Sequence, residues 1–417
     1  MKGRRDYSAA LTAARGMFEI PCEFRRELGQ IKVTKNEIQT RRRGQFILAV
    51  FSETQGDIQL KTASKWGNCQ MTATAEEFSP ASLRRQWKCA SRLVIVAVIV
   101  AVVLVVAGIG WLVSRLAEHT THSPILINGN AGFTHANGVV SGSGTASDPY
   151  IIERWAINAT RSPGIQIQNT TDWFVVQFCS ISGGGDISGF CRFAGICLLN
   201  STNGIVANCT CSNKVNGIWL ISSSNNTLMC NTCQNDAIGI GVSESSNITL
   251  ENNKCSKDGT GMVLEDSSNV TVVYDSCSSC ADGICIFWGI NNTVAHNHCS
   301  SNAFCGITLD PARGTALISN TLTDNLLYGV EIDAGSSNTI SNNAFIGNNR
   351  ASGSYDSGHT QAFDNGTSDW WNGTNGRGNY WSDWTTPDAN NDGIVDLSYG
   401  IAGDAMSKDY SPLATPP

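Results

Sequence analysis

The 417-residue chain has little charge, little proline and little histidine. Charged residues make up 15%, well below the roughly 25% of an average soluble domain, which argues against a disordered or charge-driven protein. Ten prolines are too few for a collagen-like or proline-rich linker protein. Residues 114–417 carry 11 Lys and Arg against 26 Asp and Glu. This larger part therefore lacks the basic surface that nucleic-acid binding requires, and we expect no nucleic-acid partner.

An uncharged run of 21 residues, at positions 93–113, divides the chain. A helix rising ~1.5 Å per residue would cross a hydrocarbon core of ~30 Å over this length. Basic residues cluster before the run, so the positive-inside rule predicts a single-pass anchor in the plasma membrane. Residues 1–92 would then be cytoplasmic and the bulk of the chain extracellular. The alternative is a buried β-rich segment, which the lack of turn residues and of alternation disfavours.

The segment 1–92 is basic, with 17 Lys and Arg against 9 Asp and Glu, and contains no motif or repeat. Three interpretations stay open: a small cytoplasmic domain, a disordered tail, or an over-extended start with Met71 as the true initiator. Residues 114–123 are expected to link the anchor to the exported part.

A repeat of 22–23 residues fills the exported part, and it sets the fold. Glycines recur at this interval, each before an apolar–x–apolar stretch that is typical of a short strand with one buried face: Gly195, Gly217, Gly239, Gly261, Gly283, Gly306 and Gly329. A column of mostly Asn recurs at the same interval: Asn231, Asn253, Asp275, Asn297, Asn320 and Asn343. An apolar residue follows two positions later, as Cys233, Cys255, Cys277, Cys299, Leu322 and Phe345.

Three short strands separated by Asn, Gly and Ser turns make one coil of a β-solenoid, and only stacked coils bury a continuous core. We therefore predict an all-β fold, a parallel β-helix over residues 124–350, preceded by the single transmembrane helix. Stacked asparagines should form ladders at the bends, and the glycines should provide positive-φ corners. Residues 351–417 should form a C-terminal cap with an aromatic cluster. Ile240, Leu264, Ile286 and Leu309 are expected to point inward, whereas Trp219, Val263 and Glu331 are expected to face out.

Two flanking segments carry a family resemblance. Residues Asn137–Ala159, NGVVSGSGTASDPYIIERWAINA, resemble the opening segment of exported NosD-like proteins, which are common in archaea. Residues Gly378–Trp384, GNYWSDW, and the DANNDGIVD that follows resemble the closing segment of the same group. The chain thus resembles the NosD-like, carbohydrate-binding and sugar-hydrolase (CASH) group. The resemblance implies a right-handed parallel β-helix over roughly residues 124–413, and it leaves the activity open.

Thirteen of the sixteen cysteines lie in the exported part, where disulfides are permitted. The column Cys211, Cys233, Cys255, Cys277 and Cys299 shares its inward position with Leu322 and Phe345. These cysteines are therefore expected to be small core hydrophobes. Pairing of Cys191 with Cys197, or of Cys280 with Cys305, stays open.

His296 and His298 are candidate copper or zinc ligands. If Asn297 and Cys299 point inward, both imidazoles point outward, ~6–7 Å apart along the strand. The copper association of the resembled family fits this pair. The alternative is two exposed polar residues, since no third ligand lies near in the sequence.

An acidic patch is the candidate catalytic site. Asp310, Glu331 and Asp333 occupy outward positions on successive coils, and carboxylates about 5 Å apart can act in glycoside cleavage. A lyase would also need a basic residue, for which Arg313 is the nearest candidate. Aromatic and acidic neighbours on the same face are candidate sugar contacts: Trp219, Phe287, Trp288 and Glu265. Solvated surface charges are the alternative.

The segment 388–396 resembles the first part of an EF-hand-type calcium loop. Oxygen ligands would come from positions 1, 3, 5 and 9 and from a main-chain carbonyl at position 7: Asp388, Asn390, Asp392, Asp396 and Ile394. Position 12 is Tyr399 rather than Glu, so an Asx-rich turn is the alternative. This segment makes calcium a candidate cofactor.

Three functions stay open. The favoured one is a membrane-anchored extracellular β-helix that binds carbohydrate or cell-envelope components without catalysis. The alternatives are a polysaccharide lyase or glycoside hydrolase, and a copper-handling accessory protein of the NosD type.

Overall fold

The computed structural model describes four strands within residues 32–65, and residues 119–417 apart from 184–190, 192, 352 and 375. The chain divides into two compact units, Met1–Leu112 and Val113–Pro417. In the first unit four antiparallel strands form one sheet, in the order β1 (Lys32–Thr34), β2 (Glu37–Arg42), β3 (Gln45–Thr54) and β4 (Asp57–Lys65). Within the described residues no helix is both long and apolar enough to cross a membrane. The predicted anchor 93–113 lies outside them, as does most of the rest of segment 1–92.

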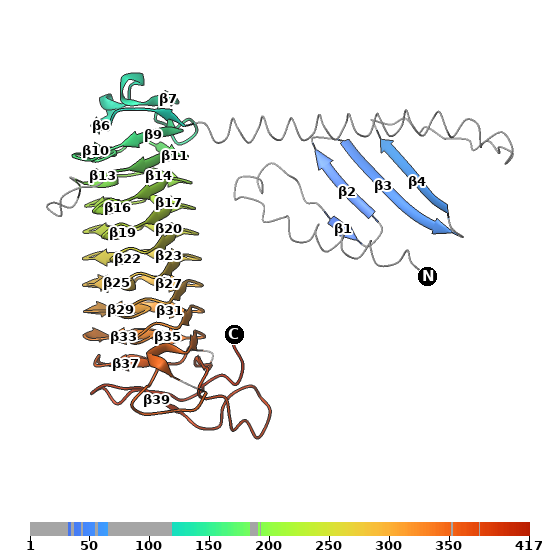
Figure 1. Ribbon diagram of the computed structural model, residues 1–417, viewed down its shortest axis with the longest axis vertical. Helices are drawn as coiled ribbons and strands as arrows, with labels where there is room; N and C mark the ends of the chain where they lie inside the picture. Colours follow the sequence, from blue (N-terminus) through green and yellow to red (C-terminus); the bar gives the residue numbers. More distant parts are fainter. Residues whose placement is uncertain are drawn as a thin grey trace. The chain divides into compact units, whose positions relative to one another are not determined.

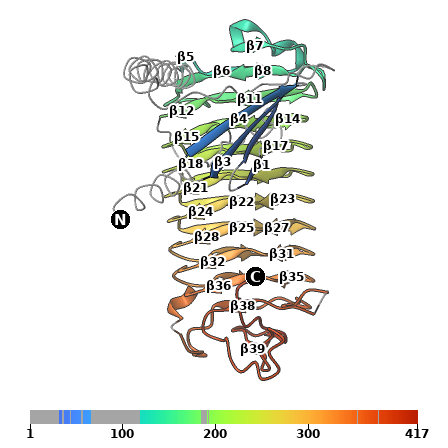
Figure 2. The same ribbon diagram turned by 90° about the vertical axis from the view of Figure 1, so that its right-hand side faces the viewer.

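The second unit is a stack of coils with three long sheets (Figures 1 and 2). The first sheet consists of β6 (Ile125–Asn128), β10 (Ile165–Thr170), β13 (Ala194–Ser201), β16 (Asn216–Ile221), β19 (Ile238–Ser243), β22 (Thr260–Glu265), β25 (Asp282–Phe287), β29 (Ile307–Leu309), β33 (Val330–Ile332) and β37 (Ala362–Asp364). The second consists of β7 (Val139–Ser141), β8 (Tyr150–Glu153), β11 (Phe174–Gln177), β14 (Gly204–Ala207), β17 (Thr227–Met229), β20 (Thr249–Glu251), β23 (Thr271–Val273), β27 (Thr293–Ala295), β31 (Ala316–Ile318) and β35 (Thr339–Ser341).

The third sheet consists of β5 (Thr120–Thr121), β9 (Trp155–Asn158), β12 (Ser180–Ser182), β15 (Thr210–Ser212), β18 (Thr232–Gln234), β21 (Lys254–Ser256), β24 (Ser276–Ser278), β28 (His298–Ser300), β32 (Thr321–Thr323), β36 (Ala344–Ile346) and β38 (Tyr380–Trp381). Pairing within the three sheets is parallel except between β7 and β8. The predicted all-β parallel solenoid is confirmed, and β37 and β38 carry its sheets past residue 350.

The strand register follows the sequence period. Leu264 pairs with Ile286 at a spacing of 22, and Ile286 pairs with Leu309 at 23. Because Cys277 and Cys299 still pair at 22, the extra residue lies in the turn between β28 and β29. The predicted inward residues, Ile240, Leu264, Ile286 and Leu309, are fully buried.

The cysteine column is also buried in the core, in the position that Leu322 and Phe345 take in later coils. These cysteines are therefore core residues, as predicted. Cys191 and Cys197 form a disulfide, whereas Cys280 and Cys305 are free thiols. Of the two pairings left open by the sequence, only the first is present.

The repeated glycines do not provide positive-φ corners, and this prediction is wrong. The corners are instead mostly Asn, Ser or Asp, as at Asn247 and Asn269. Gly239 lies inside β19, where an added Cβ would meet Gly261 O at 2.6 Å and Cys255 Sγ at 2.8 Å. The glycine column is therefore required by close packing of the coils rather than by backbone conformation.

Buried ladders stabilise the bends, as predicted. Ladder A lies between the second and third sheets and comprises Asn231, Asn253, Asp275, Asn297, Asn320, Asn343 and Asn379. Ladder B lies between the third and first sheets and comprises Lys214, Asp236, Asp258, Cys280, Asn302, Asn325, Asn348 and Gln361. A typical Asn accepts a main-chain N–H from the preceding coil and donates to a carbonyl there, which satisfies groups that no strand pairing reaches.

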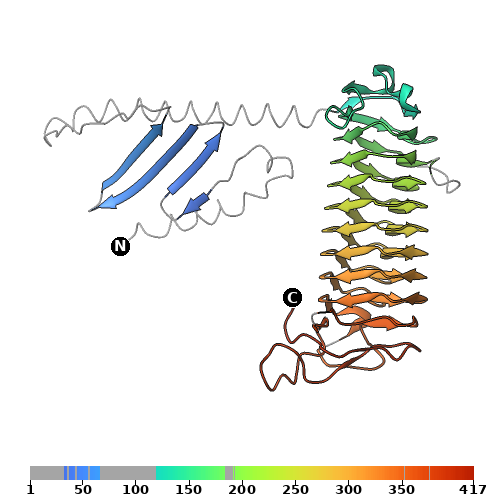
Figure 3. The same cartoon turned by 180° about the vertical axis from the view of Figure 1, so that it is seen from behind.

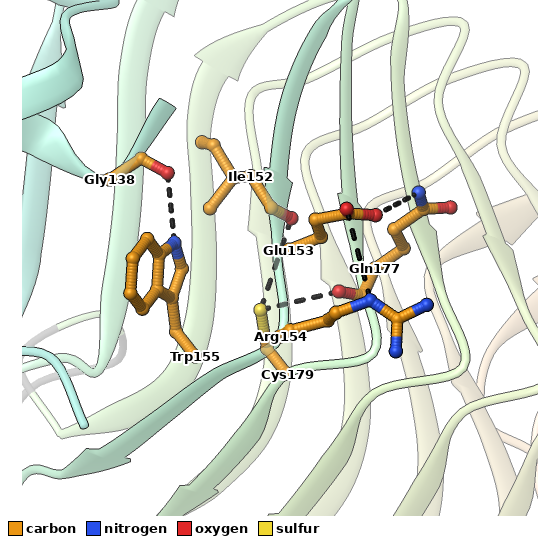
Figure 4. A network of polar contacts seen from close by, with 7 residues as sticks. All are labelled: Gly138, Ile152, Glu153, Arg154, Trp155, Gln177 and Cys179. Carbon is orange, nitrogen blue, oxygen red and sulfur yellow. Dashed lines mark hydrogen bonds and ion pairs between the residues drawn. The ribbon is translucent and has the colours of Figure 1, made fainter. Parts of the chain in front are cut away.

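Both ends of the stack are closed. At the first end lie the 3₁₀ turns η1 (Asn130–Gly132) and η2 (His135–Asn137), and Trp155 Nε1 donates to Gly138 O at 2.8 Å (Figure 4). Nearby, Gln177 Nε2 donates to Glu153 Oε2 at 2.7 Å. The C-terminal loops gather at the other end (Figure 3), with η3 (Asn348–Arg350) and the hairpin of β39 (Tyr399–Gly400) and β40 (Lys408–Asp409).

The aromatic cluster predicted for residues 351–417 covers the last coil. Phe345, Trp381 and Tyr399 stack in series, with ring centroids 4.1 and 3.9 Å apart. All three side chains are fully buried. The large flat rings thus cover core surface that a further coil would otherwise cover.

Candidate functional site

A lateral groove of about 560 Å³ lies beside the bend that follows the first sheet. It runs along a small parallel sheet formed by β26 (Gly289–Ile290), β30 (Ala312–Arg313) and β34 (Gly335–Ser336). We call it the Trp288 groove, and its lining is Asp266, Trp288, Gly289, Ile290, Pro311, Ala312, Arg313, Ala334, Gly335, Ser336 and Thr367. Strands of adjacent coils lie ~4.8 Å apart, so the groove presents closely spaced side chains from successive coils.

Local backbone geometry explains why Trp288 points outward. Trp288 has a φ of 53° and occupies the same corner as Asp266, whose φ is 46°. This left-handed conformation turns the chain sharply after the buried strand and leaves the Trp288 side chain 55% exposed. Gly289 follows, where an added Cβ would lie 2.4 Å from Ile286 Cγ2 and 2.6 Å from Asn292 Nδ2. Gly289 therefore packs against Ile286 and Asn292 more closely than a residue with a side chain could.

Charges of both signs surround the groove. Asp310 and Asp333 directly follow Leu309 and Ile332, which pair across adjacent strands. Burial and then the charge of Asp333 raise the pKa of Asp310, so the two carboxyl groups interact. Arg313 lines the groove, and its Nε donates to Ser336 Oγ at 3.2 Å. This arrangement offers hydrogen-bond donors and acceptors beside an exposed aromatic ring.

Glu331 is the third predicted catalytic carboxylate. It belongs to β33 and pairs with Thr308, and like Asp310 and Asp333 it does not line the groove itself. Its Oε2 accepts a hydrogen bond from Cys305 Sγ at 3.2 Å. Burial and the charge of Glu331 raise the pKa of the Cys305 thiol, which keeps this thiol a donor.

Trp219 is not available as a ligand contact, and the prediction that it faces solvent is wrong. Its side chain is 1% exposed and packs with Ala194 and Cys197. Its strand neighbour Gly241 leaves room for the indole, since an added Cβ would lie 1.9 Å from the ring. Val263, the next residue in this column, is 8% exposed and also buried.

The other two predicted sugar contacts lie near Trp288. Phe287 is half-buried, and its ring centroid is 6.3 Å from that of Trp288. Glu265 pairs with Phe287 across the strands and accepts from Ser243 Oγ at 3.3 Å. Neither residue lines the groove itself.

His296 and His298 are both exposed, as predicted. The ring of His296 stacks on Tyr274, with centroids 5.0 Å apart, and His298 belongs to β28. In the described part of the chain no three His, Cys, Asp or Glu residues gather in a way that could hold a metal ion. Copper or zinc binding by His296 and His298 therefore stays a prediction.

The segment 388–396 forms a tight loop of side-chain to main-chain hydrogen bonds. Asp388 accepts from Asp392 N and Gly393 N, at 3.2 and 3.1 Å. Asn390 Oδ1 accepts from Asp392 N at 3.1 Å, and Asp396 Oδ2 accepts from Ala389 N at 2.8 Å. Ile394 N donates to Asp392 Oδ1 at 2.8 Å. The loop thus has the form of an Asx-rich turn, and calcium binding stays a prediction.

The sequence pointed to Trp288 and Arg313 but missed Asp266, Ser336 and Thr367, which also line the groove. Asp266 was detectable, because it lies 22 residues before Trp288 in the repeat. Thr367 was not, because the chain leaves the regular period before it returns to bridge with Ser336.

The family profile described as "Periplasmic copper-binding protein (NosD)" matches residues 158–386, which is more than half of the chain. The chain belongs to the NosD family. A curated relative, "Probable ABC transporter binding protein NosD" of Stutzerimonas stutzeri, is 39% identical over 83 residues. That match covers 20% of this chain and only 17% of the relative, so the relative's activity does not transfer directly.

Solved structures that resemble this NosD-family chain include the Dettilon tailspike protein, at 13% identity and a TM-score of 0.37, covering 60% of this chain and 61% of that one. The periplasmic alginate epimerase AlgG has 12% identity and a TM-score of 0.34, with coverages of 62% and 87%. A lacto-N-biosidase from Eubacterium ramulus has 14% identity and a TM-score of 0.35, with coverages of 56% and 50%. Likeness of this extent carries no functional argument for this chain.

Proposed function

We propose that the protein binds carbohydrate or cell-envelope polymers along the Trp288 groove, and that a membrane anchor at residues 93–113 holds this part outside the cell. One observation carries the binding proposal: Trp288 is 55% exposed in a groove that polar side chains from successive coils line. Aromatic faces cover sugar rings, while carboxylate, hydroxyl and guanidinium groups hydrogen-bond to hydroxyls. The uncharged run with its basic N-terminal flank supports the anchor.

The test is a glycan array probed with the full chain, followed by affinity measurements on each hit. Trp288→Ala should weaken binding by about 1–3 kcal/mol, the scale for losing an aromatic anchor. Tyr274→Ala is the matched control, because Tyr274 is equally exposed at 55% but does not line the groove. Unchanged affinity of Trp288→Ala, or equal loss in both variants, would reject the groove as the binding site.

Polysaccharide cleavage is the second candidate, and the neighbouring Asp310 and Asp333 favour it. Two carboxyl groups, one with a raised pKa, are the minimum set for glycoside hydrolysis. Any glycan that binds should therefore be assayed for chain shortening. We expect Asp310→Asn and Asp333→Asn to alter affinity only. Cleavage by the wild type that either variant loses would establish an enzyme instead.

A further inference from the structure

Three buried ladder positions hold aspartate where other coils have asparagine. Asp236 and Asp258 belong to ladder B, and Asp275 belongs to ladder A; each is at most 5% exposed. In each, Oδ1 accepts a main-chain N–H from the preceding coil, at 2.5–2.8 Å. Among the described residues, Oδ2 of all three has no hydrogen-bond partner. A buried polar atom without a partner costs free energy, so this recurrence needs an explanation.

The second carboxyl oxygen occupies the place of an asparagine amide nitrogen. An added Cβ on Gly239 would lie 2.8 Å from Asp258 Oδ2, and one on Gly306 would lie 2.9 Å from Asn325 Nδ2. The asparagines use this nitrogen to donate to a core carbonyl of the preceding coil, as Asn325 does to Cys299 O at 3.1 Å. The repeat therefore places Oδ2 of Asp258 opposite a main-chain carbonyl oxygen.

In the asparagine bonds the carbonyl acceptor lies 25 residues before the donor, as for Asn253 Nδ2 with Leu228 O and for Asn302 Nδ2 with Cys277 O. The same spacing gives the expected acceptors of the three aspartates. They are the carbonyls of Cys211 for Asp236, Cys233 for Asp258 and Leu250 for Asp275. A carboxylate oxygen and a carbonyl oxygen are both acceptors, so a proton between them is required for a hydrogen bond.

We propose that Asp236, Asp258 and Asp275 are protonated in the folded solenoid, each donating from Oδ2 to a main-chain carbonyl, so that the coils around them lose stability as pH rises. This device is independent of the proposed function. It makes the middle of the stack sensitive to pH, whereas ladder positions with asparagine are indifferent to it.

The charged and titratable groups near these carboxyls do not supply a compensating cation for all three. The titratable groups that interact with Asp236 are Lys214, Cys211, Cys233 and Asp258. Those that interact with Asp258 are Asp236, Cys233, Cys277 and Cys280. Those that interact with Asp275 are Cys277 and Cys299. Lys214 Nζ donates instead to the carbonyls of Ala159 and Ser162. Burial raises the pKa of Asp236 to about 8, that of Asp258 to about 7 and that of Asp275 well above its usual range.

The sign of the pH effect follows from these directions. A carboxyl group with a higher pKa in the folded than in the unfolded chain binds more protons when folded. Its stabilising contribution is complete below about pH 4, the unfolded pKa, and is lost as pH rises through 7 to 8.

The test is thermal unfolding of the full chain at pH 4.5 and pH 8.5, with single variants Asp236→Asn, Asp258→Asn and Asp275→Asn. Asparagine supplies the missing N–H without needing a proton. Each variant should melt about 2–4 °C above the wild type at pH 8.5 and within about 1 °C of it at pH 4.5. Asp324→Asn is the matched control, because Asp324 is exposed and directly precedes ladder residue Asn325. It should show no pH-dependent gain.

A second measurement does not depend on the variants' folding. The infrared spectrum of the folded wild type at neutral pH should contain the C=O stretch of a protonated carboxyl group. Absence of this band, or Asn variants that melt no higher than the wild type at pH 8.5, would overturn the proposal. Asn variants that melt lower at pH 8.5 would also overturn it, because a bound cation rather than a proton would then satisfy Oδ2.

Discussion

The coils up to Cys299 and the coils after it form the same three sheets. Different side chains occupy their core and ladder positions. In the earlier coils the third sheet contributes cysteines to the core, and the ladders include three aspartates. In the later coils Leu322 and Phe345 take the core position and asparagines take the ladder positions. The backbone repeat therefore tolerates changes in side-chain volume and in protonation state, and the two halves should respond differently to mutation and to pH.

The largest expected loss of stability comes from a substitution in the apolar column that both halves share. Ile286→Asp places a charge among fully buried neighbours that strand pairing fixes, Leu264 and Leu309. We expect a loss of about 3–5 kcal/mol in the free energy of unfolding, measured by denaturant titration. The control is Ser278→Asp, at an outward and partly exposed position of β24, which should change stability by less than about 1 kcal/mol. Equal losses in the two variants would contradict the register.

The next prediction compares the core fillings directly. Leu322→Ala removes a branched side chain from a site with 0% exposure and should cost about 3 kcal/mol, because the cavity it leaves collapses only in part. Cys255→Ala, in the same column of the earlier coils, removes one atom and should cost about 1 kcal/mol. Denaturant unfolding of both variants measures the difference. A cost for Cys255→Ala as large as that for Leu322→Ala would mean that the cysteine column has a role beyond packing.

A third prediction transfers the aspartate ladder into the asparagine half. Asn320 Nδ2 donates to Val294 O at 2.8 Å, so Asn320→Asp replaces a donor with an acceptor there. Stability should fall by about 1–3 kcal/mol at pH 8.5 and by much less at pH 4.5, because the protonated acid again donates. Asn213→Asp, at an exposed corner with a φ of 56°, is the control and should show no such pH dependence. A pH-independent loss at Asn320 would contradict this account.

The 22–23-residue repeat made the fold predictable from the sequence. The positions of several candidate site residues could not be predicted, because they depend on contacts that the repeat does not specify. The inward column through Ile286 could be identified because strand pairing copies the sequence period. Trp219 could not be placed correctly, because its burial depends on the missing side chain of Gly241 in the next coil. The missing side chain of Gly241 thus leaves room for the Trp219 indole against the next coil. Thr367 reaches the groove from a segment that has left the period, and no spacing rule anticipates such a return.

The smallest expected effect concerns the loop 388–396 at the capped end of the later coils. Oxygen atoms of Asp388, Asn390 and Asp392 crowd this loop, and Asp392 is exposed. If the loop holds calcium, free ion at ten times the dissociation constant stabilises the folded state by about 1.4 kcal/mol. Chelator should therefore lower the Tm of the wild type and leave that of Asp392→Ala unchanged. Asp404→Ala, an exposed aspartate outside the loop, should keep the wild-type response to chelator. Equal responses of the wild type and Asp392→Ala would reject the calcium site. Stabilisation by calcium that is confined to the last coil would show that an ion stabilises this end of the stack, whereas protonation stabilises its middle coils.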